Sequence, residues 1–310
     1  MKRSNYWRLP ALALALFAAM PALAAPSVLA TVKPLHSLVA GVMAGVGKPE
    51  LLLRGAASPH SYSLRPSDAV RLQHAEVIFW IGPILETFLN KPLAALGGRA
   101  HVVELAVMPG VSLLNARTGG LWEDEEEGEA DTGALSGKDE HFWLDPENAK
   151  AMVRVIVASL SEADPADAEA YRRNGEALTV RIEALDRTLA GKLAPVQGRP
   201  FIVFHDAYQY FEKRYGLMAV GSITVHPENQ PGARRVGEVR RKIAASGAAC
   251  VFSETQFEPG LVRTLIAGTK AGTAALDEIG SDLPEGPDQY FAMMTRLADR
   301  LESCLETGKK

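Results

Sequence analysis

Short apolar runs alternate with amphipathic helical segments in this chain, first over residues 28–104 and again over residues 201–306. This alternation constrains the fold most, because it predicts parallel strands with helices on both faces of the sheet. Since the pattern occurs twice, and since 310 residues exceed the usual size of one domain, we expect an α/β fold with two lobes. The expected strands lie near 28–32, 50–53, 75–80, 101–104, 201–204, 217–223, 249–253 and 273–276.

A long segment between the two halves, residues 165–193, has almost no strand signal. Its apolar side chains recur every three or four positions, which is the period of a helix. The residues that define this period are Leu178, Ile182, Leu185, Leu189 and Leu193. The segment therefore predicts one long helix that connects an N-terminal lobe, residues 26–164, to a C-terminal lobe, residues 194–310.

Residues 1–25 have the pattern of a cleavable signal peptide. Basic residues precede an apolar stretch, residues 9–22, that is shorter than the ~20 residues needed to span a membrane. Ala22-Leu23-Ala24 then provides small residues for cleavage. We expect an exported, periplasmic protein. Removal of this basic leader would make the net charge more negative than −4, which argues against nucleic-acid binding, because that needs a basic patch.

The chain has two cysteines, Cys250 and Cys304, both in its last quarter. In an oxidising compartment a pair of cysteines is bridged more often than free, so we expect a disulfide between them. The alternative is a pair of zinc thiolates. The chain has no CxxC spacing, and this argues against the alternative.

The longest irregular stretch, residues 115–140, contains seven acidic side chains within the nine residues 123–131. Like charges at this density repel one another and cannot be buried, so we expect a disordered acidic loop in the N-terminal lobe. Two interpretations stay open. The loop is either a surface insert that adds solubility or a segment that attracts divalent cations towards a nearby site.

Three histidines and one aspartate lie where ligands bind in open α/β sheets, beyond the ends of apolar strands. His205 and Asp277 each follow a predicted strand directly. His60 lies in a loop of small residues after another strand, and His141 comes shortly before a helix start at Asp145-Pro146. Three imidazoles and a carboxylate would form a tetrahedral zinc site. Asp277 also fits a turn-capping role, in which case water would take the fourth position.

Four ordered motifs carry a resemblance to a known family. They are Ser-Pro-His-Ser-Tyr-Ser-Leu-Arg-Pro-Ser-Asp (58–68), His-Phe-Trp-Leu-Asp-Pro (141–146), His-Asp-Ala-Tyr (205–208) and Pro-Glu-Asn-Gln-Pro-Gly (227–232). With them, essentially the whole mature chain resembles the zinc-binding solute-binding proteins of bacterial ABC importers, the ZnuA type within the cluster A-I metal-binding family. The resemblance implies two Rossmann-like lobes with parallel sheets, joined by one long linking helix, with the metal held between them.

The resemblance also implies a set of ligands. The family's histidine positions fall on His60, His141 and His205, and its carboxylate position falls on Asp277. His226, which lies in a proline-containing loop, is a candidate accessory residue for metal entry. From this set we expect a site for one Zn²⁺ between the lobes.

The metal preference is argued from His205, because manganese-type relatives have a carboxylate at that position. Three neutral imidazoles suit zinc, whereas manganese prefers oxygen ligands. Zinc-type members also often have a disulfide at positions like Cys250 and Cys304. This chain departs from the family in two ways: residues 102–140 contain no histidine, and Pro59 stands where some relatives have a glutamate before the first histidine.

The resemblance implies that the protein is not an enzyme but captures Zn²⁺ in the periplasm as a transported ligand. Its partners would be the membrane permease of an ABC importer and the cytoplasmic ATPase, with the chain itself monomeric. Two alternatives stay open: a zinc-dependent hydrolase, and a protein of the same fold that binds manganese or another divalent metal. The hydrolase is disfavoured because the chain has no HExxH motif and Glu140 is a weak candidate base. Since coordination needs neutral imidazoles, we expect affinity to fall with pH through about 6 to 7.

Overall fold

The computed structural model describes residues 25–96, 98–118, 120–122, 135–224, 227, 231–256 and 260–307. The expected signal peptide, the acidic run over residues 123–134 and the accessory candidate His226 lie outside the described residues. Within the described residues, no helix is both long enough and apolar enough to span a membrane.

The N-terminal lobe is built on a four-stranded parallel sheet in the order β2-β1-β3-β4. Its strands are β1 (Val28–Ala30), β2 (Glu50–Leu51), β3 (Val77–Trp80) and β4 (His101–Glu104). All residues of β1 and β3 are buried, which is why these strands read as continuous apolar runs in the sequence. The helices of this lobe are α1 (Lys33–Val42), α2 (Pro66–His74) and α3 (Asn90–Ala95), with 3-10 turns at η1 (Thr87–Leu89) and η2 (Leu105–Val107).

The C-terminal lobe contains a three-stranded parallel sheet in the order β6-β5-β7 and a two-stranded parallel sheet, β8-β9. Its strands are β5 (Pro200–Val203), β6 (Met218–Ser222), β7 (Cys250–Val251), β8 (Ser253–Glu254) and β9 (Ala275–Leu276). The strand expected near 249–253 is present as β7 and β8, which flank Phe252. β7 pairs with β5, and Cys250 and β8 pair in one register with residues 272–276. The helices are α6 (Gln209–Tyr215), α7 (Ala233–Ser246) and α8 (Gly260–Ile266).

The predicted connecting helix is present as α5 (Ala168–Leu193), 26 residues or about 39 Å long. It begins three residues later than expected, because the preceding helix α4 (Pro146–Ala163) ends before Pro165 and the chain turns there. The buried side chains of α5 include all five that define its helical period. Gly175 allows α5 to approach α4 closely, since a Cβ at this position would lie 2.4 Å from Val157 Cγ2.

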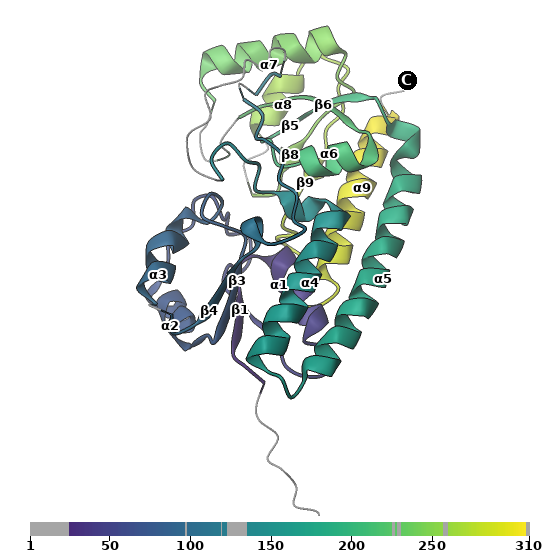
Figure 1. The fold of residues 1–310 in the computed structure, drawn as a ribbon. Coiled ribbons are helices and arrows are strands. Elements are labelled where there is room, and N and C mark those ends of the chain that lie inside the picture. Colours follow the sequence, from purple (N-terminus) through teal and green to yellow (C-terminus); the bar gives the residue numbers. More distant parts are fainter. Residues whose placement is uncertain are drawn as a thin grey trace, which may run out of the picture.

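A second long helix, α9 (Gln289–Thr307), runs beside α5 along both lobes (Figure 1). Its first turn contacts the N-terminal lobe: Tyr290 N donates to Ser37 Oγ (3.0 Å), and Tyr290 Oη donates to the carbonyl of Trp143 (3.0 Å). The α/β fold with two lobes, parallel sheets and a long connecting helix is confirmed. Two long helices, and not one, tie the lobes together.

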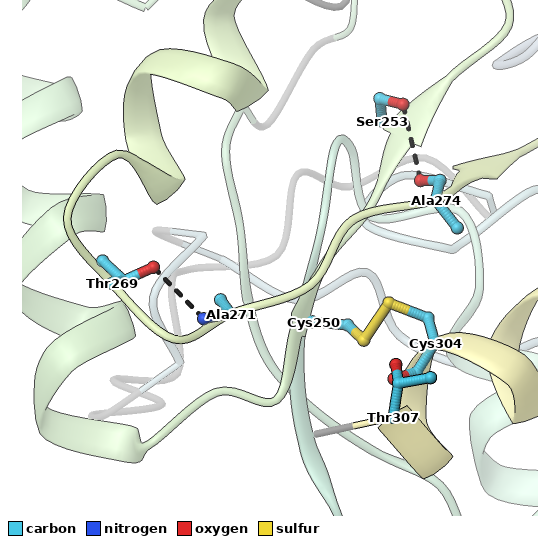
Figure 2. Close-up of a disulfide and its surroundings, with 7 residues drawn as sticks. All are labelled: Cys250, Ser253, Thr269, Ala271, Ala274, Cys304 and Thr307. Atoms are coloured by element: carbon cyan, nitrogen blue, oxygen red, sulfur yellow. Dashed lines mark hydrogen bonds between the residues drawn. A yellow bond between two sulfur atoms is a disulfide. The ribbon is translucent and has the colours of Figure 1, made fainter. Parts of the chain in front are cut away.

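The far end of α9 is joined to the C-terminal lobe by a disulfide between Cys250 and Cys304, with a Cα–Cα distance of 6.2 Å (Figure 2). Cys250 begins β7 and Cys304 lies in the last turns of α9. The bridge spans 54 residues and so closes nearly the whole second half of this lobe.

Candidate metal centre

Three histidines that are far apart in the sequence meet in the structure. The ring centroids are separated by 5.3 Å for His60 and His141, 5.5 Å for His60 and His205, and 5.3 Å for His141 and His205. One nitrogen from each ring lies within 4.8 Å of the other two. Across the described part of the chain, no other group of three His, Cys, Asp or Glu residues has this geometry. His60 and His141 come from the N-terminal lobe and His205 from the C-terminal lobe.

The 58–68 motif supports His60 through the start of α2. Asp68, in the first turn of that helix, accepts hydrogen bonds from the backbone N–H of Arg65 (2.9 Å) and from Tyr62 Oη (2.7 Å). The backbone N–H of His60 itself donates to Ser58 Oγ at 3.3 Å. These bonds link the small-residue loop to a helix end, so the half-buried His60 side chain lies on a supported loop.

His141 is oriented by a carboxylate two residues earlier. Asp139 Oδ1 accepts hydrogen bonds from the backbone N–H of His141 (3.0 Å) and from its ring Nδ1 (2.9 Å). The opposite nitrogen, Nε2, lies 3.3 Å from Nε2 of His60. The 3-10 turn η3 (Phe142–Leu144) follows directly, and Asp145 then caps α4 by accepting from the N–H of Glu147. The short path from His141 to a capped helix fixes the ring.

His205 is oriented by Glu254, which lies 49 residues later at the end of β8. Nδ1 of His205 is 2.7 Å from both carboxylate oxygens, and Tyr208 Oη also donates to Glu254 (3.3 Å). Nε2 of His205 is buried and has no hydrogen-bond partner among the described residues. The carboxylate on Nδ1 holds a proton there and turns Nε2 towards the other two rings, as in histidines that bind a metal through Nε2.

The two buried histidines have opposite pKa shifts. Burial and the nearby His205 lower the pKa of His141 to about 4. Burial also disfavours the imidazolium of His205, but the charges of Glu254 and Glu278 and the hydrogen bond that His205 donates to Glu254 outweigh it and raise the pKa of His205 to about 9. At neutral pH, a proton in the absence of metal therefore resides on His205 and not on His141.

Asp277, the expected carboxylate, is not part of the group of three. It is buried and caps a turn: Oδ2 accepts from the backbone N–H and the hydroxyl of Ser281 (both 2.7 Å), and Oδ1 accepts from the N–H of Ile279 (3.3 Å). This is the turn-capping role that the sequence left open. Whether Asp277 also binds a metal stays a prediction.

Two carboxylates that orient the histidines were not singled out from the sequence. Asp139 stands two residues before His141, and this proximity is a local signal that could have identified it. Glu254 ends a short strand, as His205 and Asp277 follow strands, but nothing local pairs it with His205. Glu140, the weak candidate base of the hydrolase alternative, is partly buried, and burial raises its pKa.

Arg117 joins the loop after β4 to the C-terminal lobe. Its guanidinium donates to Asp206 (Nε to Oδ2, 2.9 Å) and to Glu212 (Nη1 to Oε2, 2.8 Å), and it lies 3.6 Å above the Trp122 ring. Asp206 directly follows His205, so this part-buried ion pair fixes the loop that carries the third histidine. The two ends of the expected acidic loop also meet here, because Tyr210 Oη accepts from Leu114 N (2.8 Å) and donates to Asp139 O (2.7 Å).

Known proteins match the chain over nearly its whole length. The family model ZnuA, described as zinc-uptake complex component A periplasmic, matches residues 28–304. The high-affinity zinc uptake system protein ZnuA of Brucella abortus (strain 2308) is 47% identical to this chain. The alignment covers 90% of this chain and 91% of the relative. The protein of the same name from Yersinia pestis is 35% identical, and the alignment covers 99% of this chain and 100% of the relative. A crystal structure of ZnuA superposes on this structure with a TM-score of 0.76 at 25% sequence identity. The superposition covers 90% of this chain and 99% of the ZnuA chain. This chain belongs to the ZnuA family of periplasmic zinc-uptake components.

Proposed function

We propose that the chain binds one Zn²⁺ as a transported ligand through the Nε2 atoms of His60, His141 and His205. One observation carries the proposal: the nitrogens converge on one point while the Nδ1 atoms of two rings are held by carboxylates. In a zinc tetrahedron with Zn–N of about 2.0–2.1 Å, neighbouring nitrogens are about 3.3–3.4 Å apart. The distance of 3.3 Å between the nitrogens of His60 and His141 fits this edge. The buried Nε2 of His205, which has no hydrogen-bond partner in the part of the chain that the structure describes, supplies the third lone pair once the metal displaces its proton.

The fourth position belongs to Asp277 or to water. Because both oxygens of Asp277 accept hydrogen bonds within their own turn, ligation by Asp277 would require the carboxylate to give up at least one of them. We therefore propose water as the fourth ligand of the initial complex, with Asp277 as the candidate that replaces it.

Delivery of this zinc to the permease of an ABC importer, driven by a cytoplasmic ATPase, is part of the same proposal. The relatives that match over nine-tenths of the chain are named high-affinity zinc uptake system proteins, which supports it. A periplasmic location after removal of residues 1–25, and a monomeric state, complete the proposal. We propose a division into lobes at 26–164 and 194–310, with 165–193 between them. The strands before α5 and the strands after α5 form separate parallel sheets, which supports this division.

The test is metal competition on the mature protein, stripped with a chelator and then exposed to Zn²⁺ and Mn²⁺ together. We expect one zinc and no manganese per chain by elemental analysis, and loss of the zinc in His60→Ala and His205→Ala. His74→Ala is the matched control, because this exposed histidine at the end of α2 is outside the group of three. Manganese held in preference, or zinc retained by His205→Ala, would contradict the proposal. Either result would favour the alternative cargo or a different site.

A further inference from the structure

A buried lysine occupies a position where a positive charge is doubly unfavourable. Lys33 is the first residue of α1, so its charge faces the positive end of the helix dipole, and it is only 5% exposed. Burial lowers the pKa of Lys33, although acidic residues nearby act in the opposite direction. A side chain placed against two physical preferences indicates a role that offsets their cost.

The contacts of Lys33 indicate what that role is. Its Nζ donates to three backbone carbonyls of the C-terminal lobe: Ser281 (2.5 Å), Leu283 (3.0 Å) and Gly280 (3.5 Å). A lysine ammonium has three protons, and here all three have an acceptor in one turn. The lysine belongs to the N-terminal lobe, and the turn lies more than 240 residues later in the chain. Lys33 thus ties the two lobes together.

The turn that Lys33 holds is the one that carries Asp277. On its inner side, the Asp277 carboxylate accepts from Ser281. On its outer side, Trp143 Nε1 donates to the carbonyl of Glu278 (2.9 Å), and Gln289 Nε2 donates to the carbonyl of Ile279 (2.7 Å). Trp143 is two residues from His141, and their rings are 5.4 Å apart. The N-terminal lobe therefore holds the turn from the side of the metal centre.

We propose that Lys33 is a positioning residue for zinc retention: it fixes the Asp277 turn of the C-terminal lobe against the N-terminal lobe beside the three histidines. This inference rests on the proposed function, because it concerns the same metal. Without the ammonium, the carbonyls of Ser281 and Leu283 lose this donor, Gly280 O keeps only the N–H of Leu283, and the turn loosens. The lobes that contribute His141 and His205 are then less firmly held around the ion.

The test is the rate at which zinc leaves Lys33→Met, measured by transfer to an excess of a chromophoric chelator well below the unfolding temperature. We expect dissociation to be faster by roughly tenfold or more, within the range known for residues that orient metal ligands. Lys192→Met is the matched control. Lys192 also ties two elements together, through Asp299 (2.8 Å) and Glu302 (2.9 Å), but it joins α5 to α9 and does not touch the turn. Its zinc dissociation should equal that of the unmodified chain.

A double-mutant cycle shows whether Lys33 acts through the turn. Asp277→Ala removes the bonds that close the turn from inside, so Lys33→Met should add little in that background. Full additivity, or an unchanged dissociation rate in Lys33→Met, would overturn the inference while leaving zinc binding by the unmodified chain intact. Should the methionine variant fail to fold, Lys33→Gln gives the same test, because a shorter neutral amide cannot serve three carbonyls. A rate equal to that of the unmodified chain would again overturn it.

Discussion

The two sides of the metal centre position their histidines in different ways. On the N-terminal side, His141 is held by Asp139, two residues away, in a segment that leads directly into a capped helix. On the C-terminal side, His205 is held by Glu254, 49 residues away on another strand. The first arrangement is local and the second depends on the folded C-terminal lobe. The two sides also differ electrically, because the pKa of His141 is lowered to about 4 and that of His205 is raised to about 9.

This difference assigns separate tasks to the two histidines. His141 is neutral at any pH near 7 and is ready to bind a cation. His205 keeps a proton that a metal must displace, because its carboxylate partner stabilises the imidazolium. Under the proposed function, the C-terminal side is the side that makes zinc capture sensitive to pH, and its geometry depends on contacts between distant segments.

The largest effect should come from opening the C-terminal lobe. In Cys250→Ser/Cys304→Ser, loss of a bridge that closes a loop of about 55 residues should lower the free energy of unfolding by roughly 4 kcal/mol. Urea unfolding of the oxidised chain and of the double variant would measure it. Zinc affinity at low denaturant should change little, since neither cysteine touches the histidines. A stability change below about 1 kcal/mol would contradict the view that this lobe depends on long-range closure.

The next largest effect distinguishes the two carboxylates that orient the histidines, Glu254 and Asp139. Glu254→Gln and Asp139→Asn should each weaken zinc binding by roughly 10- to 100-fold, because each removes the charge that orients a ligand. Only Glu254→Gln should also change the number of protons released on binding. Calorimetry at pH 8 in buffers of different ionisation enthalpy would count them. At this pH His205 is protonated, while Asp139, whose pKa burial raises to about 7, is ionised.

We expect about one proton released per zinc from the unmodified chain and from Asp139→Asn at pH 8, and close to none from Glu254→Gln. Removal of the Glu254 carboxylate takes away the main charge that raises the pKa of His205. A smaller fraction of His205 is then protonated at pH 8, so zinc displaces fewer protons. Equal numbers of released protons in the two variants would contradict the view that the two sides of the site differ in the protonation of their histidines.

The smallest effect is the dependence on pH in the unmodified chain. The pKa of His205 is raised, so the proton is bound below about 9, and metal binding must displace it there. Affinity should therefore fall about tenfold for each pH unit already between pH 8 and 6, since one proton is exchanged per metal. Titrations at several pH values would measure the slope. The sequence alone predicted a fall confined to about pH 6 to 7, and a flat response between pH 8 and 7 would support that simpler view.

Much of this architecture could be predicted, because it follows from local patterns. The helical period of residues 178–193 predicts α5, and the apolar runs predict the parallel strands. The three histidines could be located because strand ends and ordered motifs mark them. The pairing of residues 250–254 with both β5 and residues 272–276 could not be predicted, because no local pattern encodes the choice of partner strands.

The remaining features of the site depend on contacts between distant residues. A carboxylate before a turn looks the same in the sequence whether it binds a metal or caps the turn, and in Asp277 the capping bonds are present. Glu254 and Lys33 each act on a segment far away in the chain. Their roles become visible only when burial and bond partners are known.

The most direct test of the central claim is X-ray absorption at the zinc edge of the chain loaded with one Zn²⁺. The geometry predicts three imidazole nitrogens at about 2.0–2.1 Å and one oxygen, with no sulfur. In His205→Ala the same spectrum should lose one imidazole. Fewer than three imidazoles in the unmodified chain, or an unchanged spectrum in His205→Ala, would contradict a zinc centre built from His60, His141 and His205.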